Sequence, residues 1–112
     1  MDVGTKELRI YETKDGKAPF SDWLTKLKDV SARGVIRTRL NRVRLGNLGD
    51  CKSIGDGVSE LRIDFGPGYR VYFAIEGKNL VILLVGGSKA SQRKDIERAK
   101  DYWKDYRRRS NE

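Results

Sequence analysis

Hydrophobic positions recur with helical spacing in the first half of the chain, after one alternating segment near its start. Residues 6–13 alternate apolar and polar side chains, which predicts a strand with two apolar residues on one face: Leu8 and Ile10. Pro19 then suits the first position of a helix, and the apolar residues that follow it have helical spacing: Phe20, Trp23, Leu24 and Leu27. After Gly34 a second helix is predicted up to Gly46–Asn47, with one apolar face: Ile36, Leu40 and Val43.

The period changes from about 3.6 to 2 in the second half of the chain. Residues 58–65 and 69–76 alternate, which predicts half-buried strands, and residues 79–85 are apolar throughout, as expected of a strand covered on both faces. The short loops between them, GPG and Gly77–Lys78, favour antiparallel hairpins. Helical spacing returns after Ser88 or Ser91, either of which could cap a closing helix: Ile96, Ala99, Trp103 and Tyr106.

These elements predict a single α+β domain over residues 1–112. Its expected order is an N-terminal strand, two helices, an antiparallel β meander and a C-terminal helix. No repeat, low-complexity linker or domain boundary interrupts this order.

The loop lengths also predict which side chains share a face of the meander. A three-residue GPG loop places Asp64 opposite Arg70. One face is then apolar and meets the helices, and the other collects polar side chains: Glu60, Arg62, Asp64, Arg70 and Tyr72. A two-residue loop at Gly77–Lys78 pairs Arg70 with Val85, which brings Gly87 and Lys89 to the same side. We therefore expect three cations to gather at one place: Arg62, Arg70 and Lys89.

Two features of this polar face allow more than one interpretation. Asp64 and Arg70 could form an ordinary cross-strand ion pair in solvent, or Arg70 could serve a ligand. The bare backbone of Gly86 and Gly87 could let a large ligand approach, or it could mark a bulge or the end of a strand. The charge balance favours a ligand with phosphate or acidic groups, because 24 Lys and Arg face 16 Asp and Glu, a formal charge of +8.

Composition argues against several kinds of site. The chain has one cysteine, Cys51, and no histidine, which excludes an internal disulfide and makes a Cys/His zinc or nucleophilic site unlikely. The carboxylates are too scattered for a metal site, so we expect neither a metal nor a cofactor. No stretch approaches the roughly 20 apolar residues of a membrane span, and the first ten residues lack the apolar segment of a signal peptide. A cytoplasmic protein is the expectation.

Two further groups of basic residues lie outside the meander. The second helix carries three arginines on one stripe: Arg33, Arg37 and Arg44. The C-terminal segment has three in succession, Arg107, Arg108 and Arg109, whose charges repel unless solvent, phosphate or carboxylate matches them. Both groups could follow an RNA backbone, and a solvated helix face is the alternative for the first. Trp103 and Tyr106 have the spacing of packed core residues rather than of a base-stacking platform.

The order of elements, with the segments ELRIDFGPGYRVYF and LLVGGSKASQRKDIERA, resembles the RelE/ParE toxin superfamily over nearly the whole chain. Within it, the likeness is greatest to the HigB-like or phage-derived addiction module killer branch. The resemblance implies a RelE-like fold and a toxin of a bacterial type II toxin–antitoxin system. It also implies a helix-turn-helix antitoxin as partner, with DNA contact only through the antitoxin complex.

RelE-like members are endoribonucleases, called mRNA interferases, that inhibit translation by cutting mRNA in the ribosomal A site without a metal. The resemblance therefore implies ribosome and mRNA as partners. It matches the arginine of the GYR motif to Arg70, the upstream basic residue to Arg62 and the cation after the last strand to Lys89. This chain departs from RelE at Glu60, where RelE has a lysine, and it lacks the RelE tyrosine at the start of the last helix and the histidines of HigB-type toxins.

The expected chemistry is attack by the RNA's own 2′-hydroxyl on the adjacent phosphate. Arg70 and Lys89 would stabilise the transition-state charge, and Arg62 would hold a neighbouring phosphate. Glu60 is the candidate general base, and Tyr72 is a candidate acid on condition that nearby arginines lower its pKa. Two alternatives remain open: a ParE-like inhibitor of DNA gyrase that is not a nuclease, and a catalytically inactive module that binds RNA or antitoxin.

Overall fold

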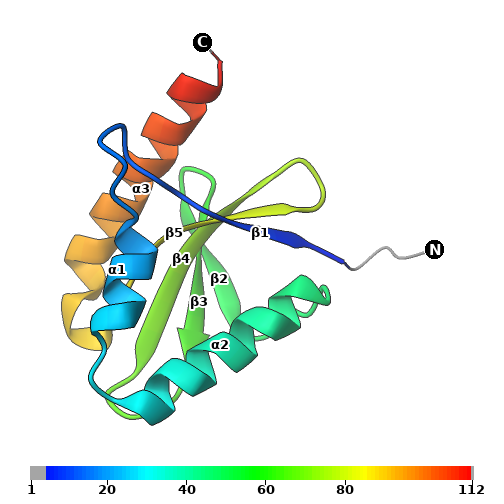
Figure 1. The fold of residues 1–112 in the computed structure, drawn as a ribbon. Coiled ribbons are helices and arrows are strands. Elements are labelled where there is room, and N and C mark those ends of the chain that lie inside the picture. Colours follow the sequence, from blue (N-terminus) through cyan, green and yellow to red (C-terminus); the bar gives the residue numbers. More distant parts are fainter. Residues whose placement is uncertain (1–4, 112) are drawn as a thin grey trace.

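Five strands form one mixed sheet in the computed structural model, which describes residues 5–111 (Figure 1). In chain order they are β1 (Glu7–Ile10), β2 (Cys51–Gly55), β3 (Val58–Ile63), β4 (Tyr69–Glu76) and β5 (Leu80–Ser88). Their order in the sheet is β1-β5-β4-β3-β2. The antiparallel meander from β2 to β5 confirms the predicted α+β class, and β1 joins it in parallel beside β5.

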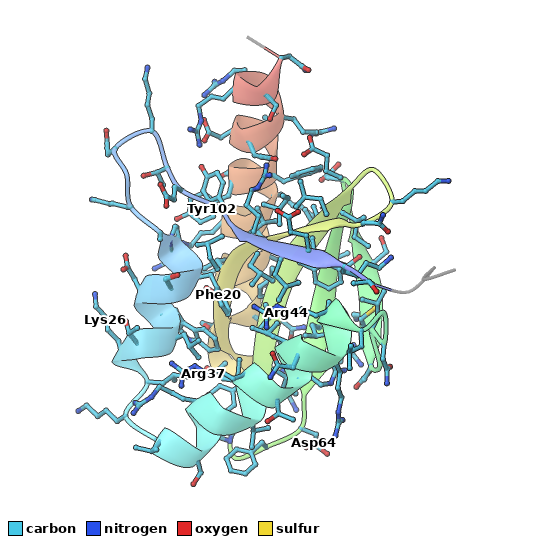
Figure 2. All side chains as sticks on the ribbon, turned by 45° about the vertical axis from the view of Figure 1, so that its right-hand side comes forward. Phe20, Lys26, Arg37, Arg44, Asp64 and Tyr102 are labelled. Atoms are coloured by element: carbon cyan, nitrogen blue, oxygen red, sulfur yellow. The ribbon has the colours of Figure 1, made fainter. Side chains whose placement is uncertain are left out.

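Three helices cover the two faces of this sheet (Figure 1). Helices α1 (Pro19–Lys26) and α2 (Val30–Arg44) share one buried cluster with alternate residues of β3, β4 and β5. Figure 2 shows Phe20 turned from α1 toward the sheet, whereas Lys26 points away from it. Helix α3 (Gln92–Ser110), which follows the short 3-10 turn η1 (Lys89–Ser91), packs on the opposite face. Within residues 5–111, no helix combines the length and apolar character that a membrane span needs.

The ends of the first two helices follow from local chemistry. Pro19 occupies the first turn of α1, as predicted. Helix α2 begins at Val30 and not after Gly34, because the Asp29 side chain accepts a hydrogen bond from the Ala32 backbone N–H at 3.2 Å. It ends as predicted near Gly46, whose φ of +92° allows its N–H to reach the carbonyl of Val43.

The β3–β4 hairpin differs from the predicted register by two residues. Arg62 pairs with Arg70 and Ile63 pairs with Tyr69, so Asp64 lies in the loop and is not opposite Arg70. The ladder ends early because the loop is longer than three residues and is closed by a hydrogen bond from the Gly68 N–H to the Phe65 carbonyl. A shift of two preserves the alternation of faces.

The β4–β5 pairing corrects a second register. Arg70 lies opposite Gly87, and Val85 lies opposite Tyr72 instead. The turn between the strands is one residue longer than predicted, since Glu76 pairs with Leu80. A bulge on β5 between the partners of Tyr72 and Phe73 adds one further residue. The longer turn and the bulge shift the pairing of Arg70 by two residues in total. Because side chains alternate between faces, Gly87 still lies on the face predicted for it.

Gly86 and Gly87 allow close packing of helices and do not leave open backbone for a ligand, which corrects that interpretation. Both lie inside β5. A Cβ on Gly86 would overlap the indole ring of Trp23 from α1, and one on Gly87 would overlap the Asp95 carboxylate of α3. The absence of side chains here lets both helices seat on the same end of β5.

A glycine pair tests this packing. We expect Gly86→Ala to lower the free energy of unfolding by about 1–3 kcal/mol, because Trp23 must move to accommodate the methyl group. Gly34→Ala is the matched control, since nothing lies within 4 Å of the added Cβ on helix α2 and alanine favours a helix interior by roughly 0.5–1 kcal/mol. Urea unfolding measures both, and equal stability of the two variants would contradict the packing account.

Candidate functional site

A hollow of about 370 Å³ lies beside the β3–β4 loop and contains the three predicted cations. Its lining comes from β3, the loop, β4, η1 and the residue before β2. The charged side chains around it are Asp50, Arg62, Asp64, Arg70 and Lys89. The structure therefore brings Arg62, Arg70 and Lys89 together. Asp64, which was predicted on the same polar face, lines the hollow from the loop, and Asp50 is an addition that sequence reasoning did not find.

Backbone pairing sets the positions of these cations. Arg62 and Arg70 are directly opposite each other on β3 and β4, the arrangement in which like charges destabilise a sheet. Lys89 opens η1, and its backbone N–H donates to the Gly68 carbonyl at 2.9 Å, which ties η1 to the loop. Something must offset the repulsion between the two arginines.

The carboxylate of Glu60 supplies that offset. Its side chain is fully buried, yet it accepts hydrogen bonds from Tyr72 Oη at 3.0 Å and Gln92 Nε2 at 2.8 Å. Arg62 Nε donates to Oε1 at 3.2 Å, and Arg70 Nε lies 3.6 Å from Oε2. One carboxylate therefore lies between both guanidinium groups and is held from the strands and from α3.

The pKa values of this cluster argue against the expected acid and base. Burial by itself would raise the pKa of Glu60, but hydrogen bonds to the carboxylate and the charge of Arg70 outweigh it, so this pKa lies below its usual range. Burial and the Glu60 charge raise the pKa of Tyr72. The charge of Arg70 acts to lower the pKa of Tyr72, as expected, but burial and Glu60 outweigh it. Both side chains are also fully buried.

A second buried carboxylate, Asp95, accompanies Glu60 and was not predicted from the sequence. Only 4% of Asp95 is exposed, and the Ser91 hydroxyl donates to its Oδ2. Arg98 Nη1 lies 3.7 Å from Oδ1. Asp95 closes over Gly87, the residue opposite Arg70, so it belongs to the packing of α3 on the sheet.

The arginine side chains differ in how far they reach solvent. The Arg62 side chain is 37% exposed and that of Arg70 is 13% exposed. In both, the inner nitrogen Nε faces Glu60. Within residues 5–111, the terminal Nη atoms of these two arginines donate no hydrogen bond. The site therefore offers guanidinium ends to an anion in the hollow.

The other predicted RNA-contacting arginines are not among the residues that line the hollow. Arg37 and Arg44 are exposed along α2, and Arg44 donates to the Asn41 side chain (Figure 2). Arg107, Arg108 and Arg109 lie in the last turn of α3. At a rise of 1.5 Å per residue, they are about 22–26 Å along the helix from Gln92, its first residue.

Contacts within the protein offset the repulsion among these C-terminal arginines. Arg108 and Arg109 each lie 2.8 Å from the Asp105 carboxylate. Arg107 lies over the Trp103 ring, 5.5 Å from its centroid. Trp103 is buried as predicted, and Tyr106 stacks on it. The Asp105 carboxylate and the Trp103 ring thus balance the three positive charges that had suggested contact with RNA phosphates.

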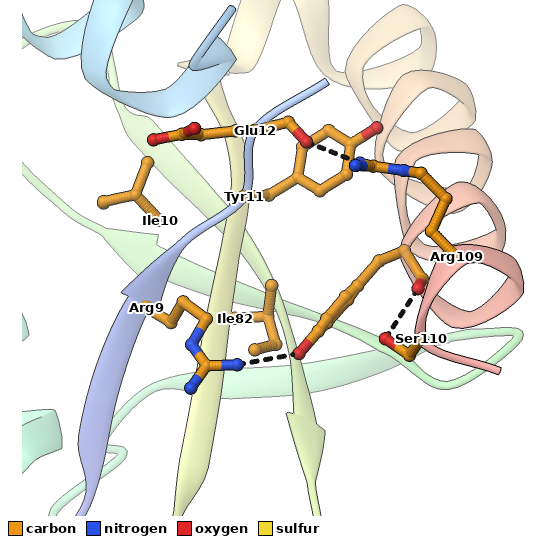
Figure 3. A pocket seen from close by; sticks show the side chains of 8 residues that line it. Arg9, Ile10, Tyr11, Glu12, Ile82, Arg109 and Ser110 are labelled. Atoms are coloured by element: carbon orange, nitrogen blue, oxygen red, sulfur yellow. Dashed lines mark hydrogen bonds between the residues drawn. The ribbon is translucent and has the colours of Figure 1, made fainter. Parts of the chain in front are cut away.

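A second hollow of about 230 Å³ lies between β1 and the end of α3 (Figure 3). Arg9 donates a hydrogen bond to the Tyr106 hydroxyl at 3.2 Å. Figure 3 shows Arg109 directed to the backbone carbonyl of Glu12. Burial and a hydrogen bond to Asp105 raise the pKa of Tyr11 to about 12. Arg9 and Arg109 already donate hydrogen bonds to other groups of the protein here. The hollow at Arg62 and Arg70 is therefore the better candidate for binding an anion.

Two comparisons place the chain among known proteins. Residues 22–104 match the family model described as Phage derived protein Gp49-like (DUF891). A protein from Haemophilus influenzae, described as an uncharacterized protein, is 53% identical over 81 residues. The matched region covers 72% of this chain and 82% of that protein.

The contact from Tyr72 to Glu60 can be tested through pH. Because the folded pKa of Glu60 is lowered, its contacts stabilise the fold above the unfolded pKa of about 4.3, and that stability is lost as pH falls through the folded value. Tyr72→Phe removes one donor to the charged form. We expect it to cost about 1–3 kcal/mol at pH 7 and less as the pH is lowered toward 3.

Urea unfolding across this pH range measures the effect. Tyr102→Phe is the matched control, because its hydroxyl accepts one hydrogen bond from Arg98 at the surface. The control is expected to stay within about 0.5 kcal/mol of the natural protein at every pH. A constant deficit for Tyr72→Phe from pH 7 to 3 would contradict the assignment to Glu60.

Proposed function

This chain belongs to the Gp49-like family of phage-derived proteins, and from that membership we propose that it is the toxin of a bacterial type II toxin–antitoxin system. The family is part of the RelE-type addiction module families. We further propose that the toxin belongs to the HigB-like, addiction module killer branch and cuts mRNA on the ribosome without a metal. The hollow that gathers Arg62, Arg70 and Lys89 is the observation that supports this proposal.

The proposed reaction uses the nucleophile within RNA. The 2′-oxygen attacks the adjacent phosphorus, the bond from phosphorus to the 5′-oxygen breaks, and a 2′,3′-cyclic phosphate and a 5′-hydroxyl result. Arg70 and Lys89 stabilise the negative charge on the phosphorane-like transition state. Arg62 holds the neighbouring phosphate and fixes the RNA for in-line attack.

Proton transfer is assigned to groups that line the hollow. Glu60 and Tyr72 are fully buried beside Gln92, so they do not reach a substrate there. Asp50 and Asp64 do line the hollow, and one of them accepts the proton of the 2′-hydroxyl in this proposal. Lys89 or water returns a proton to the 5′-oxygen. In this proposal, Asp50 or Asp64, which line the hollow, takes the role of general base that was expected of Glu60, and Lys89 or water takes the role of acid that was expected of Tyr72.

The proposed partners follow from charge. A net charge of +8 favours the ribosome and mRNA, and an acidic segment of a helix-turn-helix antitoxin would neutralise the same basic surface. DNA contact would come through the antitoxin complex, and no membrane partner is proposed.

A second candidate is a toxin that inhibits DNA gyrase without cutting RNA, or a module that binds RNA and does not cut it. The observation that favours it is the burial of Glu60 and Tyr72, which removes the two expected acid–base groups from the hollow. Growth arrest with damaged DNA and intact mRNA would identify the gyrase inhibitor. Binding to RNA without cleavage or growth arrest would identify the inactive module.

Substitution of Arg70 tests the nuclease proposal. In a purified translation system with a defined mRNA, Arg70→Ala should slow cutting by roughly 10²–10³-fold, the loss typical of one preorganised transition-state contact. Lys14→Ala is the control, because it removes one charge from an exposed turn remote from the hollow and should cut at the natural rate. Circular dichroism and antitoxin binding check that the variant is folded. Cutting by Arg70→Ala at the natural rate would remove Arg70 from the mechanism.

A further inference from the structure

The contacts of Glu60 select particular atoms of the two arginines. Both are approached at Nε, the nitrogen nearest the chain: Arg62 Nε at 3.2 Å and Arg70 Nε at 3.6 Å. Arg62 Nε donates a hydrogen bond to Glu60, whereas Arg70 Nε is buried beside the carboxylate as an ion pair without a hydrogen bond. A guanidinium contacted at Nε keeps its terminal nitrogens available, and those form the end of the planar fork that binds phosphate oxygens. Within residues 5–111, Glu60 is the one carboxylate in ion-pair contact with both side chains.

The position of Glu60 suits a support for the arginines and does not suit contact with a substrate. Its side chain is fully buried. Gln92 from α3 and Tyr72 from β4 both donate to Oε2, the oxygen nearest Arg70. The carboxylate therefore has its own orientation fixed from two elements before any ligand enters the hollow. Such preorganisation is what an anion site requires, because the arginines then lose little freedom on binding.

We propose that Glu60 is a positioning residue that holds Arg62 and Arg70 as one phosphate-binding pair, with their terminal nitrogens directed into the hollow. The ligand class is a phosphate group, since Arg62, Arg70 and Lys89 line one hollow and a tetrahedral anion can accept hydrogen bonds from all three side chains. The proposal relies on the proposed function for one point, that the phosphate belongs to RNA.

The binding part can be tested without catalysis. Inorganic phosphate is titrated into ¹⁵N-labelled protein, and the arginine Nε–Hε signals are followed by NMR. In the natural protein, the signals of Arg62 and Arg70 should shift together with one dissociation constant. Glu60→Gln keeps the size of the side chain and removes the charge, and it should weaken phosphate binding by about tenfold or more.

A variant that exchanges the charge between residues 60 and 92 tests whether phosphate affinity depends on a carboxylate beside the arginines or only on the stability of the fold. Gln92 Nε2 lies 2.8 Å from Glu60 Oε2, so the double variant Glu60→Gln/Gln92→Glu returns a carboxylate to the same cluster from the side of α3. We expect it to recover part of the lost phosphate affinity. Lys14→Ala, in the exposed turn before α1, should bind phosphate like the natural protein. Unchanged affinity in folded Glu60→Gln would overturn the proposal.

A second variant covers the case in which Glu60→Gln does not fold. Gln92→Leu removes one donor to the carboxylate and leaves every residue of the hollow in place. Gln92→Leu should weaken phosphate binding by less than Glu60→Gln does. The NMR signals of Arg62 and Arg70 should then no longer shift with one common dissociation constant. Binding as tight as that of the natural protein would again overturn the proposal.

The pH dependence of RNA cutting distinguishes this role from that of a general base. A positioning role predicts that the charge-exchange double variant cuts RNA with the same pH dependence as the natural protein and at a reduced rate. Loss of the acidic limb of the profile in that variant would instead make Glu60 the base and overturn the proposal. If phosphate binds as described and RNA is never cut, the nuclease proposal fails and the positioning role of Glu60 stands.

Discussion

The burial of the Glu60 carboxylate between two arginines is the interaction on which the candidate site depends. Arg62 and Arg70 face each other across β3 and β4, an arrangement that a sheet tolerates poorly without a counter-charge. A buried carboxylate is costly in turn unless its oxygens are hydrogen-bonded, and Tyr72 and Gln92 meet that requirement. The same cluster thus joins the sheet to α3 and leaves two guanidinium ends toward the hollow.

Much of the site could be predicted because side chains in a strand alternate strictly between two faces. Both predicted hairpin registers were wrong in their pairs, yet the offset at Arg70 was two residues in each. An even offset keeps the side chains at this end of the sheet on their predicted faces, whereas between Leu80 and Leu83, before the bulge, the offset is one residue. The grouping of Arg62, Arg70 and Lys89 therefore holds in the structure, although Asp64 is not the partner of Arg70.

Two parts of the structure were not predicted, for different physical reasons. Strand β2 was missed, although Asp56 and Gly57 after it have φ of +56° and +83°, the pattern of an Asp-Gly hairpin turn. Local periodicity also does not say which part of a polar face a helix will cover. Helix α3 covers Glu60 and Tyr72, and it leaves the side of the hollow with Asp50 and Asp64 open.

The most direct test of the account is a map of RNA 5′ ends across all transcripts, minutes after the intact protein or its Arg70→Ala variant is induced in a bacterial host. The account predicts new ends within translated codons, in frame, for the intact protein, and their absence for the variant at equal protein level. Identical new ends from both proteins, or growth arrest by the intact protein with no new ends, would contradict the central claim that Arg70 and its hollow cut mRNA.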